Sequence, residues 1–93
     1  MPRICCHPGE VLNEEYLVPL GMSARALSQV IEAPPNRMSD IVRQRRGMTA
    51  DTAIRLWRFS GTDPRFWLNL QQAHELSKAE AETDYSRIPT RAA

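Results

Sequence analysis

Residues 23–46 constrain the fold of this chain more than any other stretch. Apolar side chains recur there at i, i+3 and i+4 in two short segments, which is the spacing of one helix face. The two triplets are Leu27, Val30 and Ile31, and then Met38, Ile41 and Val42. Each triplet makes one apolar stripe on a helix too short to be stable alone, so the pattern predicts two helices that share a core.

The second of these helices is polar on the side opposite its apolar triplet. That outer face carries Asn36, Arg37, Asp40, Arg43 and Gln44. Pro35 suits the first helical position because its missing N–H would be unpaired there anyway, and we expect it to point Asn36 and Arg37 outward. Two short, tightly joined helices with a polar, cationic second helix are typical of a helix-turn-helix DNA reader.

The positive charge of the chain lies in the same region. The net charge is only +1 at pH 7, but residues 23–65 hold eight Arg against four carboxylates, an excess of +4. Arg offers a planar fork that suits phosphate and guanine. A solvated surface is the plain alternative, and the DNA interpretation depends on the charge coinciding with the helix pair.

Capping and stop signals predict three further helices, over about residues 7–18, 49–59 and 64–78. Their expected inner faces are Val11, Leu12 and Tyr16; Ala53, Ile54 and Trp57; and Phe66, Leu70 and Ala73. We expect a single domain over residues 1–93, ordered over about 7–78, with a frayed start and a C-terminal tail over 79–93.

Trp67 and Leu68 fall off the core-facing line expected for the last helix. A second apolar face on a small domain indicates a partner surface, and Trp is common at interfaces. Because one recognition helix reads only a few base pairs, we predict a homodimer that pairs through Trp67 and Leu68. The alternative is that Trp67 completes the core of the monomer.

The sequence gives no sign of catalysis, of a metal or of a cofactor. Cys5 and Cys6 are adjacent and poorly placed for a disulfide, and a metal site would need more ligands than His7 and His74 add. We therefore expect free thiols near a loose terminus, and Cys5, Cys6 and His7 to be dispensable. No apolar run is long enough to span a bilayer and no signal-peptide pattern is present, so we expect a cytoplasmic protein.

Four blocks of sequence carry a resemblance to a known family. They are HPGEVL at residues 7–12, PPNRMS at 34–39, RGMTADTA at 46–53 and PRFWLNLQ at 64–71. In this order they resemble the HigA/VapI antitoxins, which are helix-turn-helix proteins of the Xre type. The resemblance covers about residues 7–78. It implies an all-α, five-helix, lambda-repressor-like helix-turn-helix domain that dimerises mainly through its C-terminal region.

The resemblance also implies function. Proteins of this family bind double-stranded DNA, repress their own toxin–antitoxin operon and neutralise a HigB/RelE-type toxin that cleaves mRNA. By position, Asn36, Arg37 and Asp40 match the base-facing sites of the recognition helix. The phosphate-facing sites match Ser23, Arg43, Arg45 and Arg46, and the expected DNA surface also includes Pro35 and Ser39. Trp67 and its neighbours match the dimer region.

Two departures from the family pattern leave the operator sequence open. Glu32 stands at the hinge, where Gly is usual, and Arg45-Arg46 stands where the family often has a small residue or Lys. A positive φ at Glu32 would cost about 1 kcal/mol relative to Gly.

Two other functions stay open. One is a stand-alone transcriptional regulator without a toxin, and the other is a protein-interaction module whose helix-turn-helix has lost DNA binding. A ribonuclease-like neighbouring gene would separate the first from an antitoxin, and binding to its own promoter would separate the second.

Overall fold

The computed structural model describes residues 5–91, and within that range the regular elements are all helices. In chain order they are α1 (Pro8–Leu12), the π-helical turn η1 (Asn13–Leu17), α2 (Val18–Leu20), α3 (Ala24–Val30), α4 (Arg37–Val42), α5 (Ala50–Ser60) and α6 (Pro64–Glu82). Because α1, η1 and α2 follow one another without a break, the described residues form five helical bodies. The expected all-α, five-helix, helix-turn-helix architecture is confirmed.

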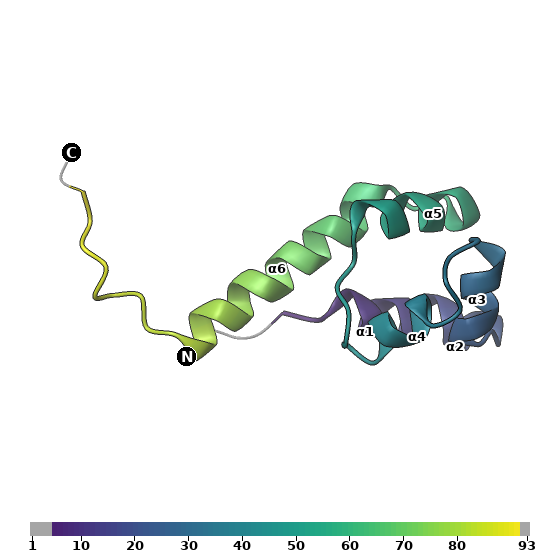
Figure 1. Ribbon diagram of the computed structural model, residues 1–93, viewed down its shortest axis with the longest axis horizontal. Coiled ribbons are helices and arrows are strands. Elements are labelled where there is room, and N and C mark those ends of the chain that lie inside the picture. The colour runs from purple at the N-terminus through teal and green to yellow at the C-terminus, as the bar shows by residue number, and fades with distance from the viewer. Residues whose placement is uncertain (1–4, 92–93) are drawn as a thin grey trace.

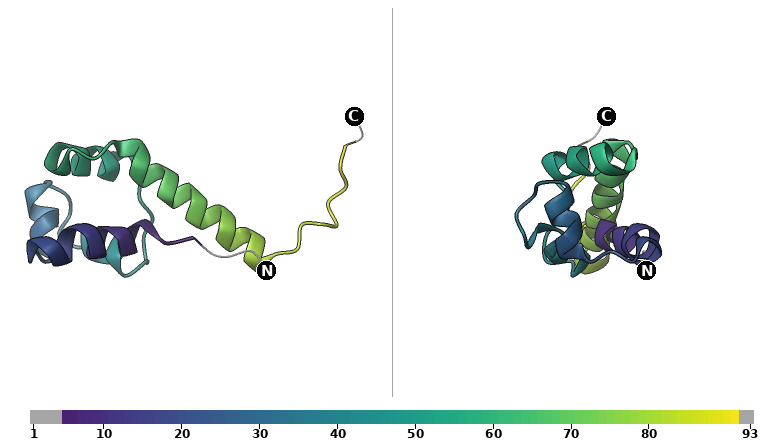
Figure 2. Two further views of the ribbon diagram at one scale, coloured as in Figure 1. Left: turned by 180° about the vertical axis from the view of Figure 1, so that it is seen from behind. Right: turned by 90° about the vertical axis from the view of Figure 1, so that its right-hand side faces the viewer.

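The helices gather at one end of an elongated molecule with extents of 51 × 24 × 21 Å. Figure 1 shows α1 to α4 together, α5 lying across from them, and α6 running away toward the C-terminal segment. The C-terminal part of α6 and the residues after it project from this body, as the left view of Figure 2 also shows. Helix α6 continues past residue 78 to Glu82, so the first part of the expected tail is helical.

The helix ends follow local capping chemistry. The side chains of Ser23, Thr49 and Asp63 accept hydrogen bonds from backbone N–H groups at the starts of α3, α5 and α6. Gly21 (φ 61°) and Gly61 (φ 77°) end α2 and α5 in the left-handed conformation that Gly adopts at little cost. These are the stop and start signals that the sequence carries.

The first helical body starts at a buried histidine. His7 is only 5% exposed, and its Nδ1 accepts a hydrogen bond of 2.9 Å from the N–H of Gly9. Residues Cys5 and Cys6 before it are exposed and free. The backbone of Cys5 is held by α6, because its N–H donates to Ser77 and its carbonyl lies 2.8 Å from Nδ1 of His74. His7 is therefore an ordered cap of the first helical body, and the dispensability of Cys5, Cys6 and His7 stays a prediction. Residues 1–4 of the expected frayed start lie outside the described residues.

Gly9 lets α1 pack directly on α4. A Cβ at this position would collide with the backbone carbonyl of Ile41. The core that this contact closes consists of Leu12, Leu17, Leu27, Ile31, Met38, Ile41, Met48, Ala53, Leu56 and Trp67. The inward stripes expected for α3 and α4 are confirmed at Leu27, Ile31, Met38 and Ile41, whereas Val30 is 51% exposed.

The inner faces expected for the last two helices are right at Ala53 and Leu70 but wrong at the other positions. On α5, Ile54 and Trp57 are 49% and 42% exposed, and Thr52 and Leu56 join Ala53 in the core instead. On α6, Trp67 is completely buried whereas Phe66 is 42% exposed. The physical reason is that the buried face of each helix contains a polar residue whose hydrogen bonds are satisfied inside the protein, and apolar spacing does not identify such residues. Thr52 bonds to Thr49, and Gln71 accepts from the N–H of Met48 at 2.7 Å.

Candidate nucleic-acid interface

The connection between α3 and α4 is fixed by polar contacts. The hydroxyl of Ser23 accepts from the N–H of Ala26 at 3.0 Å and starts α3. The buried hydroxyl of Ser28 accepts from the N–H of Met38 at 3.1 Å, which joins the two helices directly. Glu32 has φ 57°, so the hinge does adopt the left-handed conformation in which Gly is usual.

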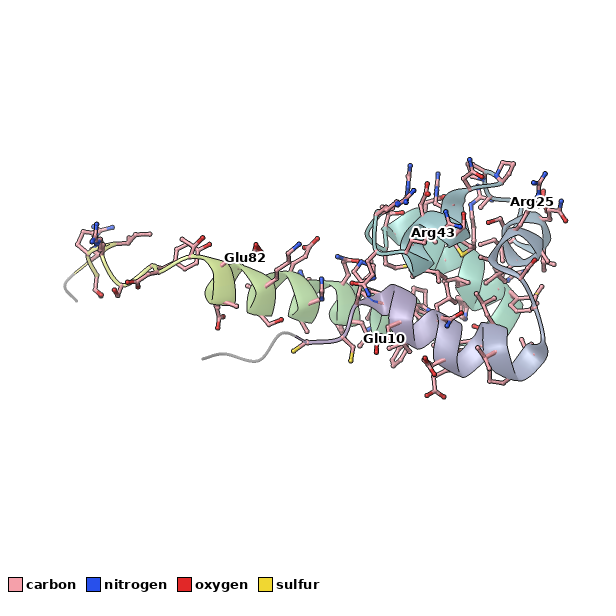
Figure 3. All side chains as sticks on the ribbon, turned by 90° about the horizontal axis from the view of Figure 1, so that it is seen from below. Glu10, Arg25, Arg43 and Glu82 are labelled. Carbon is pink, nitrogen blue, oxygen red and sulfur yellow. The ribbon has the colours of Figure 1, made fainter. Side chains whose placement is uncertain are left out.

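The outer face of α4 and its flanking residues present polar side chains, most of which are exposed. Asn36 occupies the cap position of α4, yet its side chain makes no capping hydrogen bond, and both Pro35 and Asn36 are exposed. Arg43 is also exposed, and Ser39 and Asp40 are half-buried beside it. Figure 3 shows Arg43, directly after α4, on the same side of the molecule as Arg25 of α3. Pro35, Asn36 and Arg43 are therefore accessible at and beside α4, as the sequence predicted.

Arg37 is the exception, because its guanidinium turns inward. Its side chain is only 18% exposed. Nη1 donates to the hydroxyl of Thr52 at 3.0 Å and lies 3.7 Å from the carboxylate of Asp51, both in the first turns of α5. Its Nε is buried and has no hydrogen-bond partner among residues 5–91. The expectation that Arg37 points outward beside Asn36 is therefore wrong.

Two further arginines follow α4 in an exposed loop. Helix α4 ends at Val42, Gln44 follows with φ 62°, and the N–H of Arg45 donates to the carbonyl of Asp40 at 2.8 Å. Arg45 and Arg46 then line a shallow hollow of about 170 Å³ together with His74 and Lys78 of α6. Within residues 5–91, the ion pairs involve Arg37, Arg55 and Arg65, so Arg43, Arg45 and Arg46 are left unpaired.

Lys78 and His74 are basic neighbours of this loop that sequence reasoning missed. They follow Arg46 by about thirty residues, and only the packing of α6 brings them to the same hollow. Glu75 lines the hollow as well, so its charge is mixed. No local pattern in the sequence marks this pairing.

His7 at the edge of the same hollow has a shifted pKa. Burial lowers the pKa of His7 below its ordinary value of 6.5, and the nearby His74 and Lys78 lower it further, whereas Glu75 raises it. The rings of His7 and His74 meet edge to face with their centroids 4.9 Å apart. Among the described residues, no group of three or more His, Cys, Asp or Glu side chains could hold a metal ion.

Trp67 lies inside the monomer, contrary to the expected dimer surface. It is completely buried between Tyr16, at 5.4 Å between ring centroids, and Phe66, at 5.2 Å. Leu68 is half-buried against the same core. A side chain without exposed area cannot be offered to a partner, so the alternative reading of Trp67 as a core residue is the right one.

The exposed aromatic surface lies instead on α5. Ile54, Trp57 and Pro64 line an open cleft of about 500 Å³, which we name the α5 apolar surface. The guanidinium of Arg58 lies 5.5 Å from the ring centroid of Trp57. Sequence reasoning placed both Ile54 and Trp57 in the core because they have the period of a helix face.

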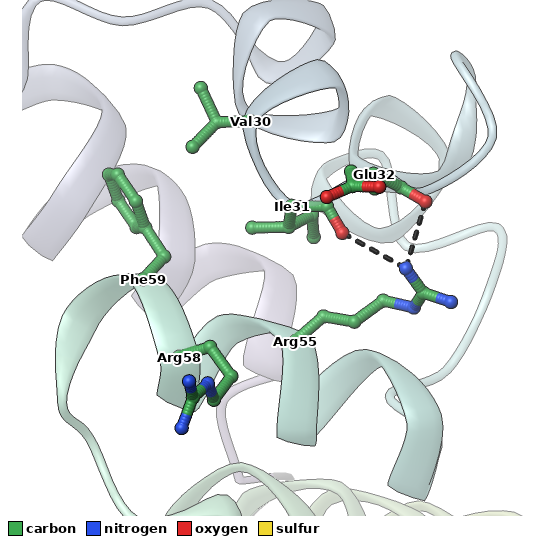
Figure 4. Close-up of a pocket in the computed structure, with 6 residues that line it drawn as sticks. All are labelled: Val30, Ile31, Glu32, Arg55, Arg58 and Phe59. Carbon is green, nitrogen blue, oxygen red and sulfur yellow. Dashed lines mark hydrogen bonds between the residues drawn. The ribbon is translucent and has the colours of Figure 1, made fainter.

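A second hollow of about 480 Å³ lies where α3 ends beside α5 (Figure 4). Val30 and Phe59 border it from the two helices. At its other side, Nη1 of Arg55 donates to the carbonyl of Ile31 at 3.1 Å and to that of Glu32 at 2.8 Å. Arg55 therefore caps the C-terminal end of α3.

Comparison with known proteins places this chain among close relatives. No protein-family model matches the chain. It is 52% identical over 82 residues to virulence-associated protein I of Dichelobacter nodosus, which covers 88% of this chain and 74% of the relative. None of the described helices is long and apolar enough to cross a membrane.

Two similar structures were solved with DNA. One is the Pseudomonas aeruginosa antitoxin HigA with the higBA promoter, at 36% identity and a TM-score of 0.79, covering 92% of this chain and 99% of that one. The other is a Pseudomonas aeruginosa protein in complex with its operator DNA, at 40% identity and a TM-score of 0.82, covering 86% of each chain. The similarity therefore extends over most of the residues that build the helix-turn-helix.

Proposed function

The chain belongs to the HigA/VapI family of Xre-type helix-turn-helix antitoxins, and we propose that it binds the operator of its own operon through α4 as a homodimer and neutralises a HigB/RelE-type toxin. The observation that carries the DNA part is the outer face of α4. It is polar and cationic, and the fold leaves Asn36 and Arg43 exposed there, whereas the hydroxyl of Ser39 donates to the carbonyl of Asn36. Two relatives of similar structure are bound to operator or promoter DNA, which supports the same use of this surface.

Roles within this surface follow from residue chemistry. Asn36 can pair with adenine and Arg43 with guanine or phosphate, because both are exposed and not held by other side chains. Pro35, Ser39 and Asp40 complete the face that enters the major groove. Ser23, Arg45 and Arg46 lie at its margins and contact phosphates, which gives affinity without sequence preference.

The homodimer forms through the α5 apolar surface in this proposal. Ile54 and Trp57 are large, apolar and about half exposed, and Trp is the residue most typical of interface hot spots. Trp57 thereby takes the role that the sequence suggested for Trp67. Pairing places two recognition helices about 34–36 Å apart, one turn of B-DNA, and doubles the length of the site that is read.

Binding to promoter DNA tests the first half of the proposal. The assay compares a duplex from upstream of the protein's own gene with a scrambled duplex of the same composition. We expect clear preference for the promoter duplex, and Asn36→Ala together with Arg43→Ala should abolish that preference while α-helical circular dichroism is kept. Equal affinity of the unaltered protein for both duplexes would refute DNA recognition.

Co-expression with the product of the neighbouring gene tests the second half. We expect the two proteins to purify together and growth arrest caused by the neighbour to be relieved. A neighbour that is harmless alone, or that fails to purify with this protein, would contradict the antitoxin role. DNA preference without toxin binding would identify a stand-alone regulator.

A further inference from the structure

One carboxylate of α5 contacts two arginines that link α5 to both helices of the helix-turn-helix. Asp51 sits in the first turn of α5. Its Oδ2 accepts from Nε of Arg55 at 3.0 Å and lies 3.7 Å from Nη1 of Arg37. Two arginines from different helices therefore share a single oxygen atom.

Each of these arginines reaches a different part of the DNA-reading unit. Arg37 is the first residue of α4, so its contacts with Asp51 and Thr52 hold the start of the recognition helix against α5. Arg55 holds the other helix, because the same guanidinium that meets Asp51 also donates to the carbonyls of Ile31 and Glu32 at the end of α3 (Figure 4). The α3 end, the α4 start and the α5 start thus meet in one polar network.

The burial of Arg37 indicates that this network matters for geometry rather than for stability. A guanidinium that is mostly buried, with a buried and unpaired Nε, is costly compared with an apolar residue of similar size. The carboxylate of Asp51 is 63% exposed, and exposed ion pairs stabilise a fold only slightly. Directional bonds at the left-handed turn of Glu32 do, however, restrict how α4 can rotate relative to α3.

We propose that Asp51 is a positioning residue, which sets the angle of α4 relative to α3 through Arg37 and Arg55 and so controls how well the protein distinguishes its operator from other DNA. Arg37 is accordingly a structural link and not a base-reading residue. This inference rests on the proposed DNA binding. Asp51 acts without contributing a favourable contact to DNA, because its carboxylate would repel phosphate.

Asp51→Ala is the variant that tests this role. Its affinity for the promoter duplex should fall about tenfold, whereas its affinity for the scrambled duplex should stay the same or rise slightly, since one negative charge is lost. Asp51→Glu keeps the carboxylate and should recover most of the promoter affinity. In the free protein, amide chemical shifts of α3 and α4 should change in Asp51→Ala.

Asp84→Ala is the matched control. Asp84 is another exposed aspartate, located after α6, so its replacement makes the same change in net charge far from the network. It should leave both affinities and the α4 chemical shifts unchanged. If Asp51→Ala loses its helical circular dichroism, Asp51→Asn replaces it in the same comparison.

Three results with Asp51→Ala, and one with the unaltered protein, would overturn the inference. Equal rises on both duplexes would show that Asp51 only repels phosphate. Equal falls on both would show a general loss of the fold, and unchanged promoter preference would show that the network does not orient α4. If the unaltered protein shows no promoter preference, the proposed function fails and this inference fails with it. The three results with Asp51→Ala refute only the inference.

Discussion

Replacing Trp67 by Ala should destabilise the folded monomer severely. The side chain is 0% exposed and packs between the rings of Tyr16 and Phe66. Truncating a buried Trp to Ala typically costs about 3–5 kcal/mol, since apolar contacts are lost and a cavity remains. A domain of this size has a free energy of unfolding on the order of 5–14 kcal/mol. The change therefore removes a large share of the total and should lower the urea midpoint strongly.

Trp67→Phe should cost much less, and the reason is the indole nitrogen. Nε1 of Trp67 is buried and has no hydrogen-bond partner among residues 5–91. A buried N–H without a partner carries a desolvation penalty of about 1–3 kcal/mol. Phe removes this penalty and keeps most of the aromatic contacts, so the smaller ring and the lost penalty partly cancel. We expect a net loss below about 2 kcal/mol.

Urea unfolding followed by far-ultraviolet circular dichroism measures both variants. Trp57→Ala is the matched control, because it removes the same side chain from an exposed site. Any loss in that control should depend on protein concentration, as expected when a dimer contact is removed, whereas the loss in Trp67→Ala should not. A Trp67→Ala protein that unfolds within about 1 kcal/mol of the unaltered chain would refute the core assignment.

Four further outcomes are expected. Stability should fall as the pH drops below about 6.5, because the pKa of His7 is lowered only in the folded state and the unfolded chain then binds the proton more readily. Protonated Nδ1 also cannot accept the hydrogen bond from Gly9. In His7→Asn, the urea midpoint should change less with pH across that range. Gly9→Ala should lower the melting temperature, since its Cβ would collide with Ile41, and an unchanged value would contradict the close packing of α1 on α4. Arg45→Ala should weaken promoter and scrambled DNA alike and reduce the slope of log affinity against log salt by about 1. Trp57→Ala should sediment as a monomer with its helical content kept, and an intact dimer would place the interface elsewhere.

The sequence predicted the helix-turn-helix well because its signals are local. Ser23 and Thr49 cap α3 and α5 through bonds to nearby N–H groups, and Gly61 ends α5, close to the bounds that the sequence predicted. Apolar spacing also identified the buried apolar residues of the two segments, although it wrongly included Val30 and could not identify the buried Ser28. Both kinds of signal depend on neighbours within one helical turn.

The faces of α5 and α6 could not be predicted in the same way. Thr52 and Gln71 are buried because distant groups satisfy their hydrogen bonds, and a hydropathy pattern counts such residues as outward-facing. Arg37 was misplaced for the same reason. Its partners Asp51 and Thr52 come from the following helix, and nothing in the PPNRMS block indicates them.

The segments before and after α4 share a backbone conformation that has consequences for association with DNA. Glu32 (φ 57°) and Gln44 (φ 62°) both place a side-chain-bearing residue in the left-handed region, at roughly 1 kcal/mol each relative to Gly. Gly would relieve that strain but would also leave each joint looser, because Gly has access to far more backbone states. The chain therefore trades some stability for stiff joints on both sides of α4. A recognition helix held in this way meets DNA already oriented, and less conformational freedom is lost when the complex forms.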